Sequence, residues 1–476
     1  MIYGLQKGAG LDESVHTLRR KGQIALGVGR GRLLDSSGCA LDGCAPIKTT
    51  SVANGDSLTL HLSRVQVEAS SHAFAAILGD GSVETWGNAD FGGDSSAAQG
   101  QLQDVQQIQA SHRAFAAILG DGSVVTWGAG SLGGDSSAVQ GQLKNVQQVQ
   151  ACAWAFAAIL GDGSVVTWGD ANYGGDSSAV HGQLKDVQQI QASFGAFAAI
   201  LGDASVVTWG DAIFGGDSSA VQGQLKNVQQ VQASAGAFAA ILRDGSVVTW
   251  GDAAMGGDSS AVQGQLQDVQ QIQASHRAFA AILGDGSVVT WGHADMGGDS
   301  RAVQGQLKNV QQVQASESAF AAILGDGSVV TWGDADMGGD SRAVQGQLKN
   351  VQQVQASLFV FSALPGTSAA FAAILGDGSV VTLGDADMGG DSRAVQGQLK
   401  NVQQVQASAG AFAAILGDGS VVTWGEPGLG GDSSAVQGQL RGGDSSAVQD
   451  QLGYTDQQRL AAHAVLQKFE DRSWAE

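Results

Sequence analysis

The feature that most constrains the fold of this chain is a unit of 41 residues that recurs nine times. One copy, at 310–350, reads "VQQVQASESAFAAILGDGSVVTWGDADMGGDSRAVQGQLKN". The step between copies is constant, except for 51 residues between Trp332 and Leu383, where ten extra residues surround 358–367. A fixed period of this length predicts a repeat array such as a propeller or a solenoid. Leu383 occupies the position that is otherwise a structural Trp, namely Trp86, Trp127, Trp168, Trp209, Trp250, Trp291, Trp332 and Trp424.

Short apolar segments inside each unit predict β-strands. "AFAAIL" and "SVVTW" are β-prone, and the Gly-Asp-Gly between them is typical of a hairpin turn because glycine accepts a positive φ. "VQQVQA" is a candidate third strand and "AVQGQL" a weaker fourth. Helices are disfavoured because glycine interrupts every apolar run within about eight residues. A unit of this size cannot bury its apolar faces alone and needs its neighbours to cover them.

The repeats resemble those of the regulator-of-chromosome-condensation family. The resemblance rests on "GDGSVVTWG", the preceding "VQQVQAS" and the Gly six residues after each Trp, and it covers roughly residues 64–441. It implies an all-β, propeller-like array of seven or more blades. The chain departs from the family at Ala114-Phe115, where His-Thr is usual, and at 338–341, where Gly-Gln-Leu-Gly is usual. Nine short units exceed the common seven blades, so ring closure stays open, with an open β-array or a β-solenoid as the alternative.

Residues 1–63 differ from the repeats. A helix is expected within 12–28, followed by a strand-turn-strand and a last alternating strand at 54–62. This order resembles the later part of a ubiquitin-like β-grasp domain that lacks its first hairpin. The alternative is a short α+β cap that covers the edge of the array. The helix would present one apolar face formed by Val15, Leu18, Gly22 and Ala25.

Residues 442–476 repeat "GGDSSAVQ" once and then change to a helical pattern. Leu460, Ala464 and Leu466 predict an amphipathic helix, with Thr455 or Asp456 as its N-cap. We expect this helix to pack on the array, with partner binding as the alternative.

Charge and composition exclude several classes of function. A formal net charge of −21 argues against nucleic-acid binding and against an anionic membrane surface. No apolar run approaches the roughly 20 residues of a membrane helix, and the first residues lack a secretory signal. We therefore expect a soluble, intracellular protein, with cytoplasm or nucleus left open. The three cysteines are too few and irregular for a disulfide framework or a zinc site.

No group of residues predicts an enzyme. Asp334, Asp336 and Asp340 are spaced like the start of a calcium loop, but Gln345 stands where the bidentate Glu is needed. A solvated acidic turn is the favoured interpretation. The histidines lack metal-ligand spacing, and neither a nucleophile elbow nor a phosphate loop is present. We expect no catalytic residue, no metal and no cofactor.

Differences between the copies are concentrated in the two residues before "AF" and the three or four after "TWG". If the two strands are antiparallel, both stretches lie at one end of each hairpin and the "GDGS" turns lie at the other. Aromatic residues and Met are enriched at interface centres, so this end is a candidate partner-binding face. Drift in tolerant loops would produce the same variation. The candidate residues are Phe91, Trp154, Tyr173, Phe194, Phe214, Met255 and Glu317.

The sequence therefore predicts a non-enzymatic protein–protein interaction scaffold. Condensation-regulator repeats beside a ubiquitin-like segment resemble the HERC group of ubiquitin ligases, but no HECT domain is present, which implies an adaptor in ubiquitin ligation. The alternative is guanine-nucleotide exchange or regulation of a small GTPase, the activity of the family's founding member. A third alternative is an array amplified with little selection on its surface.

Overall fold

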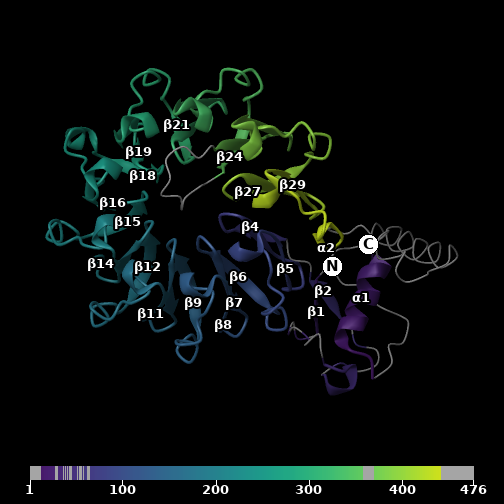
Figure 1. Ribbon diagram of the computed structural model, residues 1–476. Coiled ribbons are helices and arrows are strands. Elements are labelled where there is room, and N and C mark those ends of the chain that lie inside the picture. Colours follow the sequence, from purple (N-terminus) through teal and green to yellow (C-terminus); the bar gives the residue numbers. More distant parts are fainter. Residues whose placement is uncertain are drawn as a thin grey trace, which may run out of the picture.

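The computed structural model describes residues 12–26, 31–35, 45–50, 58–61, 65–357 and 369–440, and the single positions 37, 39, 41, 52 and 56. Within these residues the chain forms nine three-stranded antiparallel sheets and one two-stranded sheet. The nine sheets follow one another around a ring in sequence order (Figure 1). The expected all-β, propeller-like repeat architecture is confirmed.

In each sheet the "VQQVQA" strand is innermost and contacts the inner strands of the neighbouring sheets. The inner strands are β3 (Gln66–Ala69), β6 (Val105–Ala110), β9 (Val146–Ala151), β12 (Val187–Ala192), β15 (Val228–Ala233), β18 (Val269–Ala274), β21 (Val310–Ala315), β24 (Val351–Ala356) and β27 (Val402–Ala407).

The "AFAAIL" strand is central and the "VVTWG" strand is outermost. The central strands are β4 (Ala73–Ile77), β7 (Ala114–Leu119), β10 (Ala155–Leu160), β13 (Ala196–Leu201), β16 (Ala237–Leu242), β19 (Ala278–Leu283), β22 (Ala319–Leu324), β25 (Ala370–Leu375) and β28 (Ala411–Leu416). The outer strands are β5 (Val83–Gly87), β8 (Val124–Gly128), β11 (Val165–Gly169), β14 (Val206–Gly210), β17 (Val247–Gly251), β20 (Val288–Gly292), β23 (Val329–Gly333), β26 (Val380–Gly384) and β29 (Val421–Gly425).

The predicted fourth strand, "AVQGQL", is wrong. In the second repeat this segment forms consecutive turns, with Val139 N–H bonded to the Ser136 carbonyl and Gln142 N–H to the Val139 carbonyl. The side chain of Gln140 donates to the carbonyl of Val124 on the outer strand, at 2.9 Å. A side-chain amide therefore satisfies part of the sheet edge that a fourth strand would have paired.

Each sheet buries its apolar face against the next sheet. Phe115 is fully buried and stacks on Trp127, with ring centroids 5.1 Å apart. Both belong to one core cluster with Ala75 and Ile77 of the preceding sheet. The indole Nε1 of Trp127 donates to the carbonyl of Gly92, also in the preceding repeat, at 3.0 Å. The repeated Phe and Trp thus form the interface between sheets, as the need for neighbours predicts.

The ninth sheet packs against the first through the same contacts. Trp86 Nε1 donates to the carbonyl of Gly430 at 3.1 Å, and Phe74 shares a core cluster with Ile415. A backbone bond from Ala409 N–H to the Ser71 carbonyl, 3.0 Å, joins the inner ends of the two sheets. These contacts close the ring, which resolves the alternative that the sequence left open.

A small α+β unit precedes the ring. Helix α1 (Val15–Leu26) packs beside β1 (Arg32–Leu34) and β2 (Thr59–His61), which pair antiparallel, and a 3-10 turn, η1 (Ile47–Thr49), completes it. In Figure 1 the unit lies outside the ring, beside β5. Its core consists of Val15, Leu18, Leu33, Ile47 and Leu60. Val15 and Leu18 are two of the residues predicted for the apolar face of the helix.

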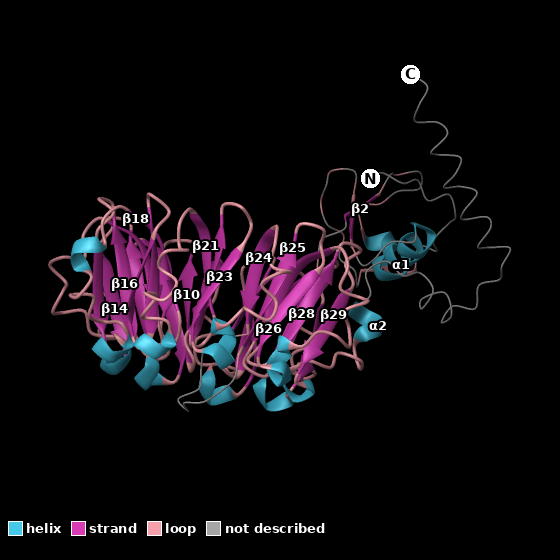
Figure 2. Ribbon diagram, turned by 90° about the horizontal axis from the view of Figure 1, so that it is seen from above, coloured by secondary structure: helices cyan, strands magenta, loops and turns pink. Residues whose placement is uncertain are grey.

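The strands run between two faces of the ring, and most of the short helices gather at one of them (Figure 2). We call this the variable face: it carries the turns between inner and central strands and the helices after the outer strands. The opposite tip face carries the Asp-Gly-Ser turns. The helices of the variable face are η2 (Ala89–Phe91), η3 (Gly130–Leu132), η4 (Ala171–Tyr173), η5 (Ala212–Phe214), η6 (Ala253–Met255), η8 (Ala294–Met296), η9 (Ala335–Gly339), η10 (Ala386–Gly390) and η11 (Pro427–Leu429).

Two further short helices, η7 (Gln263–Gln265) and α2 (Gln437–Leu440), lie in the connections after outer strands. None of the helices described here is long and apolar enough to cross a lipid bilayer. The predicted C-terminal helix and the insertion at 358–367 lie outside the described residues.

Candidate partner-binding site

Hydrogen bonds fix the turns of the variable face in the same way in most repeats. In the fourth repeat the carboxylate of Asp211 accepts from Ile213 N–H at 2.8 Å and so caps η5. Gly215, with φ of 90°, ends that helix in the left-handed conformation. Ser193 Oγ then donates to the Phe214 carbonyl at 2.7 Å, which ties the helix to the turn between β12 and β13. The variable residues therefore stand on a rigid frame.

Four aromatic side chains from two neighbouring sheets meet on this face. The Trp154 ring lies 3.9 Å from Tyr173 and 4.5 Å from Phe194 between centroids, and Phe194 lies 5.4 Å from Phe214. Met255 of the fifth repeat packs against the same group. We call these five residues the aromatic cluster. All five are among the predicted candidates, and the fold brings them together from positions up to 101 residues apart.

The members of the cluster differ in exposure. Phe194 is only 5% exposed, so it supports the cluster from below and cannot form its outer surface. Trp154, Tyr173, Phe214 and Met255 are partly exposed. Ile213, beside Phe214, is 66% exposed and is the one large apolar side chain that stands out from the described surface.

Phe91 lies in a separate group on the same face, formed by the first two sheets. Its ring packs against His72 in a tilted arrangement with centroids 4.0 Å apart, and the guanidinium of Arg113 lies 4.4 Å from the ring centroid, a cation–π contact. His112 packs edge-on to Phe91, and its Nδ1 forms a 2.5 Å hydrogen bond with Ser71 Oγ. Burial, with a smaller contribution from the charge of Arg113, lowers the pKa of both His72 and His112 to about 4. Both imidazoles are therefore neutral at pH 7.

Glu317, the seventh candidate, is only 5% exposed, and its main-chain carbonyl accepts from His276 N–H at 2.9 Å. Its side chain therefore lies below the outer surface of the variable face. The sequence had predicted it to lie on that surface.

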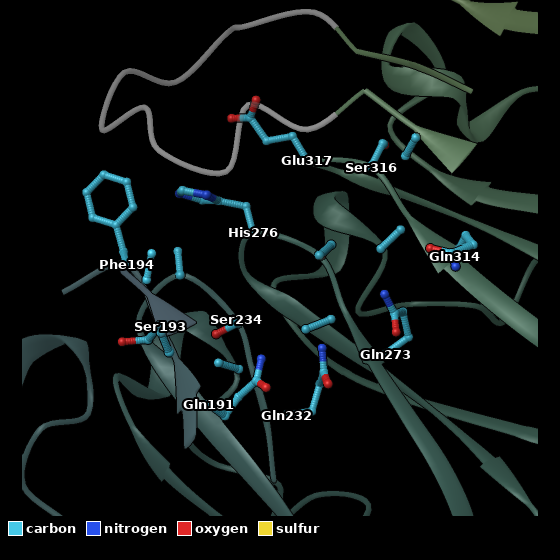
Figure 3. A pocket seen from close by; sticks show the side chains of 18 of the residues that line it. Gln191, Ser193, Phe194, Gln232, Ser234, Gln273, His276, Gln314, Ser316 and Glu317 are labelled. Carbon is cyan, nitrogen blue, oxygen red and sulfur yellow. The ribbon is translucent and has the colours of Figure 1, made fainter. Parts of the chain in front are cut away.

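Glu317, His276 and Phe194 line a cavity of about 270 Å³ inside the ring (Figure 3). One Gln from each of seven inner strands, among them Gln191, Gln232, Gln273 and Gln314, lines the same cavity. The first repeat has Glu68 at this position in the sequence. Burial raises the pKa of Glu68 to about 7, against a smaller lowering by a backbone hydrogen bond at Ala69. The first repeat thus has, at the position equivalent to these amides, a carboxyl group that titrates near neutrality.

Among the described residues no group of three or more His, Cys, Asp and Glu side chains could hold a metal ion. Asp334 instead caps η9 by accepting from Asp336 N–H, and Asp340 accepts from Arg342 N–H at 3.0 Å. Burial raises the pKa of the Cys152 thiol to about 12, which makes it a poor nucleophile.

Comparisons with known proteins do not assign the chain to a family. No protein-family model matches it, and no curated protein sequence is significantly similar. Among solved structures, the computationally designed protein Ika8 has a TM-score of 0.33 and 15% identity, covering 68% of this chain and 96% of its own. Prp20p of Saccharomyces cerevisiae, which is yeast RCC1, has a TM-score of 0.35 and 13% identity over 58% and 83% of the two chains.

The CRINKLY WD40 ectodomain of the Arabidopsis thaliana receptor kinase ACR4 has a TM-score of 0.31 and 16% identity over 57% and 93%. Prp20p, yeast RCC1, belongs to the family that the repeats resemble. The likeness to HERC-type ligases and the ubiquitin-like nature of the N-terminal unit stay predictions.

Sequence reasoning missed several residues of the variable face. Ile213 was overlooked, although a large apolar residue stands there where most copies have a small or polar one. His72 and Arg113 were also missed as neighbours of Phe91. Variation between copies was the signal that could have identified them, because Ile213 and His72 differ from all their equivalents and Arg113 is matched only by Arg277.

Proposed function

We propose that this protein is a non-enzymatic scaffold that binds a partner protein through the aromatic cluster and Ile213. The observation that carries the proposal is the 66% exposed Ile213 beside partly exposed aromatic rings on a hydrogen-bonded frame. Aromatic side chains held rigidly at the centre of a patch are the residue type that dominates binding energy at protein interfaces.

The edge of the patch points to the chemistry of the partner. Asp170, Asp211 and Asp252 cap the three short helices that carry Tyr173, Phe214 and Met255. An apolar centre with carboxylates at its edge favours a partner segment with an apolar anchor flanked by Lys or Arg.

A site-specific cross-linker tests this proposal. The photoreactive amino acid p-benzoylphenylalanine replaces Ile213 in one protein and Ser131 in a second. Ser131 is exposed and occupies the same position of the second repeat, on the same face but outside the aromatic cluster. We expect one protein to be captured from cell lysate at position 213 and not at 131. Equal capture at both positions, or none at 213, would refute the proposal.

A binding measurement with the captured partner then checks the residues. Ile213→Lys should weaken binding at least about tenfold, since it removes an exposed apolar anchor and places a cation against a basic partner. Ser131→Lys adds the same charge at the equivalent position and should change affinity by less than about twofold. Equal urea-unfolding midpoints would show that both variants keep the fold.

The identity of the partner decides between the two finer roles. An adaptor in ubiquitin ligation would bind a ligase component or its substrate, whereas a regulator would bind a small GTPase. Stimulated release of a labelled guanine nucleotide by the intact protein, lost in Ile213→Lys, would support the second role.

A further inference from the structure

The N-terminal unit is held on the tip face by two ion pairs with the repeats. Arg19 of α1 lies 3.0 Å from the carboxylate of Asp80, in the first Asp-Gly-Ser turn, and both side chains are largely buried. Arg32 of β1 lies 2.7 Å from the carboxylate of Asp104, which precedes the second inner strand. The Arg32 guanidinium also packs directly on Gly81 of the same turn. Together, Asp80, Gly81 and Asp104 form an acceptor site for two guanidinium groups.

The repeat places equivalent residues at each following interface between sheets, and we call each such place a groove. Between the second and third sheets it is an open hollow of about 290 Å³ lined by Asp121, Gly122 and Asn145, among others. Here the second acid is replaced by an amide. The same replacement is found at positions 227, 309, 350 and 401, which are all Asn.

Two other grooves keep both acids. Asp162, Gly163 and Asp186 lie between the third and fourth sheets, and Asp244, Gly245 and Asp268 between the fifth and sixth. The carboxylate of Asp186 accepts from Gln188 Nε2 at 2.7 Å, just as that of Asp104 accepts from Gln106 at 2.9 Å. The two carboxylates are therefore oriented alike.

No cation stands beside Gly163 in the third groove as Arg32 stands beside Gly81 in the first. The nearest atoms to a side chain added at Gly163 belong to the backbone of Asp186 and Val187, and none comes from a cation. No ion pair within the described residues involves Asp162 or Asp186. The occupied first groove shows, in the same molecule, what such a site holds.

We propose that the Asp162–Asp186 and Asp244–Asp268 grooves bind an arginine-bearing segment of a partner protein, in the way that the Asp80–Asp104 groove binds Arg19 and Arg32. Guanidinium is favoured over ammonium because a planar donor group can lie flat on the glycine and still reach the carboxylates. This site is on the face opposite the aromatic cluster, so the proposal does not depend on the proposed function.

The structure itself provides a conservative variant. Asp186 and Asp268 have φ values of 56° and 54°, and Asn takes the same left-handed conformation at 227 and 309. The Asn145 carbonyl oxygen accepts from Gln147 as Asp186 does from Gln188, at 3.0 Å. Asp→Asn at these positions therefore removes the charge and keeps the local contacts.

The test uses the full chain and a fluorescein-labelled tetra-arginine peptide, with tetra-lysine as the comparison, in fluorescence anisotropy. The acceptor variant is Asp162→Asn/Asp186→Asn/Asp244→Asn/Asp268→Asn. The control variant, Asp121→Asn/Asp203→Asn/Asp285→Asn/Asp326→Asn, removes the same charge from turns that face Asn. We expect the acceptor variant to bind tetra-arginine about fivefold more weakly and the control less than twofold, since exposed ion pairs are individually weak.

Several results would overturn the proposal. Equal weakening in both variants would show that the peptide is attracted only by the net charge of −21. Equal affinity for tetra-lysine and tetra-arginine would refute the preference for guanidinium. If the unmodified protein did not bind tetra-arginine, the proposal as a whole would be refuted. Concentration-dependent dimers that the acceptor variant abolishes would assign the grooves to the N-terminal unit of a second copy, not to a partner.

Discussion

The indole of Trp86 donates its hydrogen bond to the carbonyl of Gly430, 344 residues away along the chain. At seven of the other interfaces the equivalent bond spans 35 residues, as from Trp209 to Gly174, and at the eighth Leu383 replaces the Trp. The two bonds have the same length, 3.1 Å, and each joins a fully packed Phe–Trp stack to the preceding sheet. The junction between the two ends of the array is therefore built like the seven other junctions that contain a Trp.

Trp86→Phe should destabilise the protein by about as much as Trp209→Phe. Each variant keeps an aromatic ring on its Phe partner but leaves a buried carbonyl without its donor, which costs about 1–3 kcal/mol. The midpoint of urea unfolding, followed by far-ultraviolet circular dichroism, measures both. A loss at Trp209→Phe with none at Trp86→Phe would mean that the ring is open in solution.

Gly174→Ala should be strongly destabilising. Gly174 has a φ of 96°, and an added Cβ would lie 2.6 Å from the Phe197 ring, so backbone strain and overpacking together cost about 2–4 kcal/mol. Gly182→Ala in the same repeat is the matched control, because nothing lies within 4 Å of its added Cβ. Thermal unfolding compares the two, and similar melting temperatures would contradict the packing described for Gly174.

Glu68→Gln should change how stability depends on pH. The folded-state pKa of about 7 exceeds the ordinary value of 4.5, so the folded state holds the proton more tightly. This contribution is fully present below pH 4.5 and is lost as the pH rises through 7. Relative to the unmodified protein, Glu68→Gln should gain about 1–3 kcal/mol between pH 4.5 and pH 8. Urea titrations at both pH values measure the difference, and parallel pH profiles would refute the pKa shift.

Cys152 should not react with thiol reagents in the folded protein. It is fully buried, its thiol donates to the Tyr173 carbonyl at 3.2 Å, and its pKa is about 12. In a Cys39→Ser/Cys44→Ser background, 5,5′-dithiobis(2-nitrobenzoic acid) should detect no thiol under native conditions and one in guanidinium chloride. A fast native reaction would show that the turn at Cys152 opens readily.

The sequence was sufficient for the parts of the fold that depend on local pattern. The hairpin of "AFAAIL" and "SVVTW" was predictable because short apolar β-prone segments and a glycine turn act within about 14 residues. The fourth strand was mispredicted because "AVQGQL" has the right composition but meets an edge whose Val124 carbonyl already bonds Gln140. Ring closure could not be predicted, because it depends on the sum of the rotations at the eight interfaces between successive sheets.

The location of the candidate site was predictable from the sequence, but the residues that form its outer surface were not. Comparing copies located the variable face, since Trp154 and Tyr173 both differ from their equivalents in other repeats. The depth of each side chain was not accessible in the same way. Phe194 and Glu317 occupy the same turn position as the partly exposed His276, yet both are 5% exposed. Their burial depends on neighbouring sheets, which a single unit does not reveal.

The close similarity of the interfaces between sheets also bears on how the chain finds its order. Eight of the nine sheets carry the same Phe, Trp and Gly, so these residues alone do not distinguish correct docking of one such sheet from shifted docking. The ion pairs from Arg19 and Arg32 mark one position in this otherwise uniform circle, because they join the N-terminal unit to the first two sheets only. The N-terminal unit thus distinguishes the first two sheets from the other seven, and so fixes where the circular order of sheets begins.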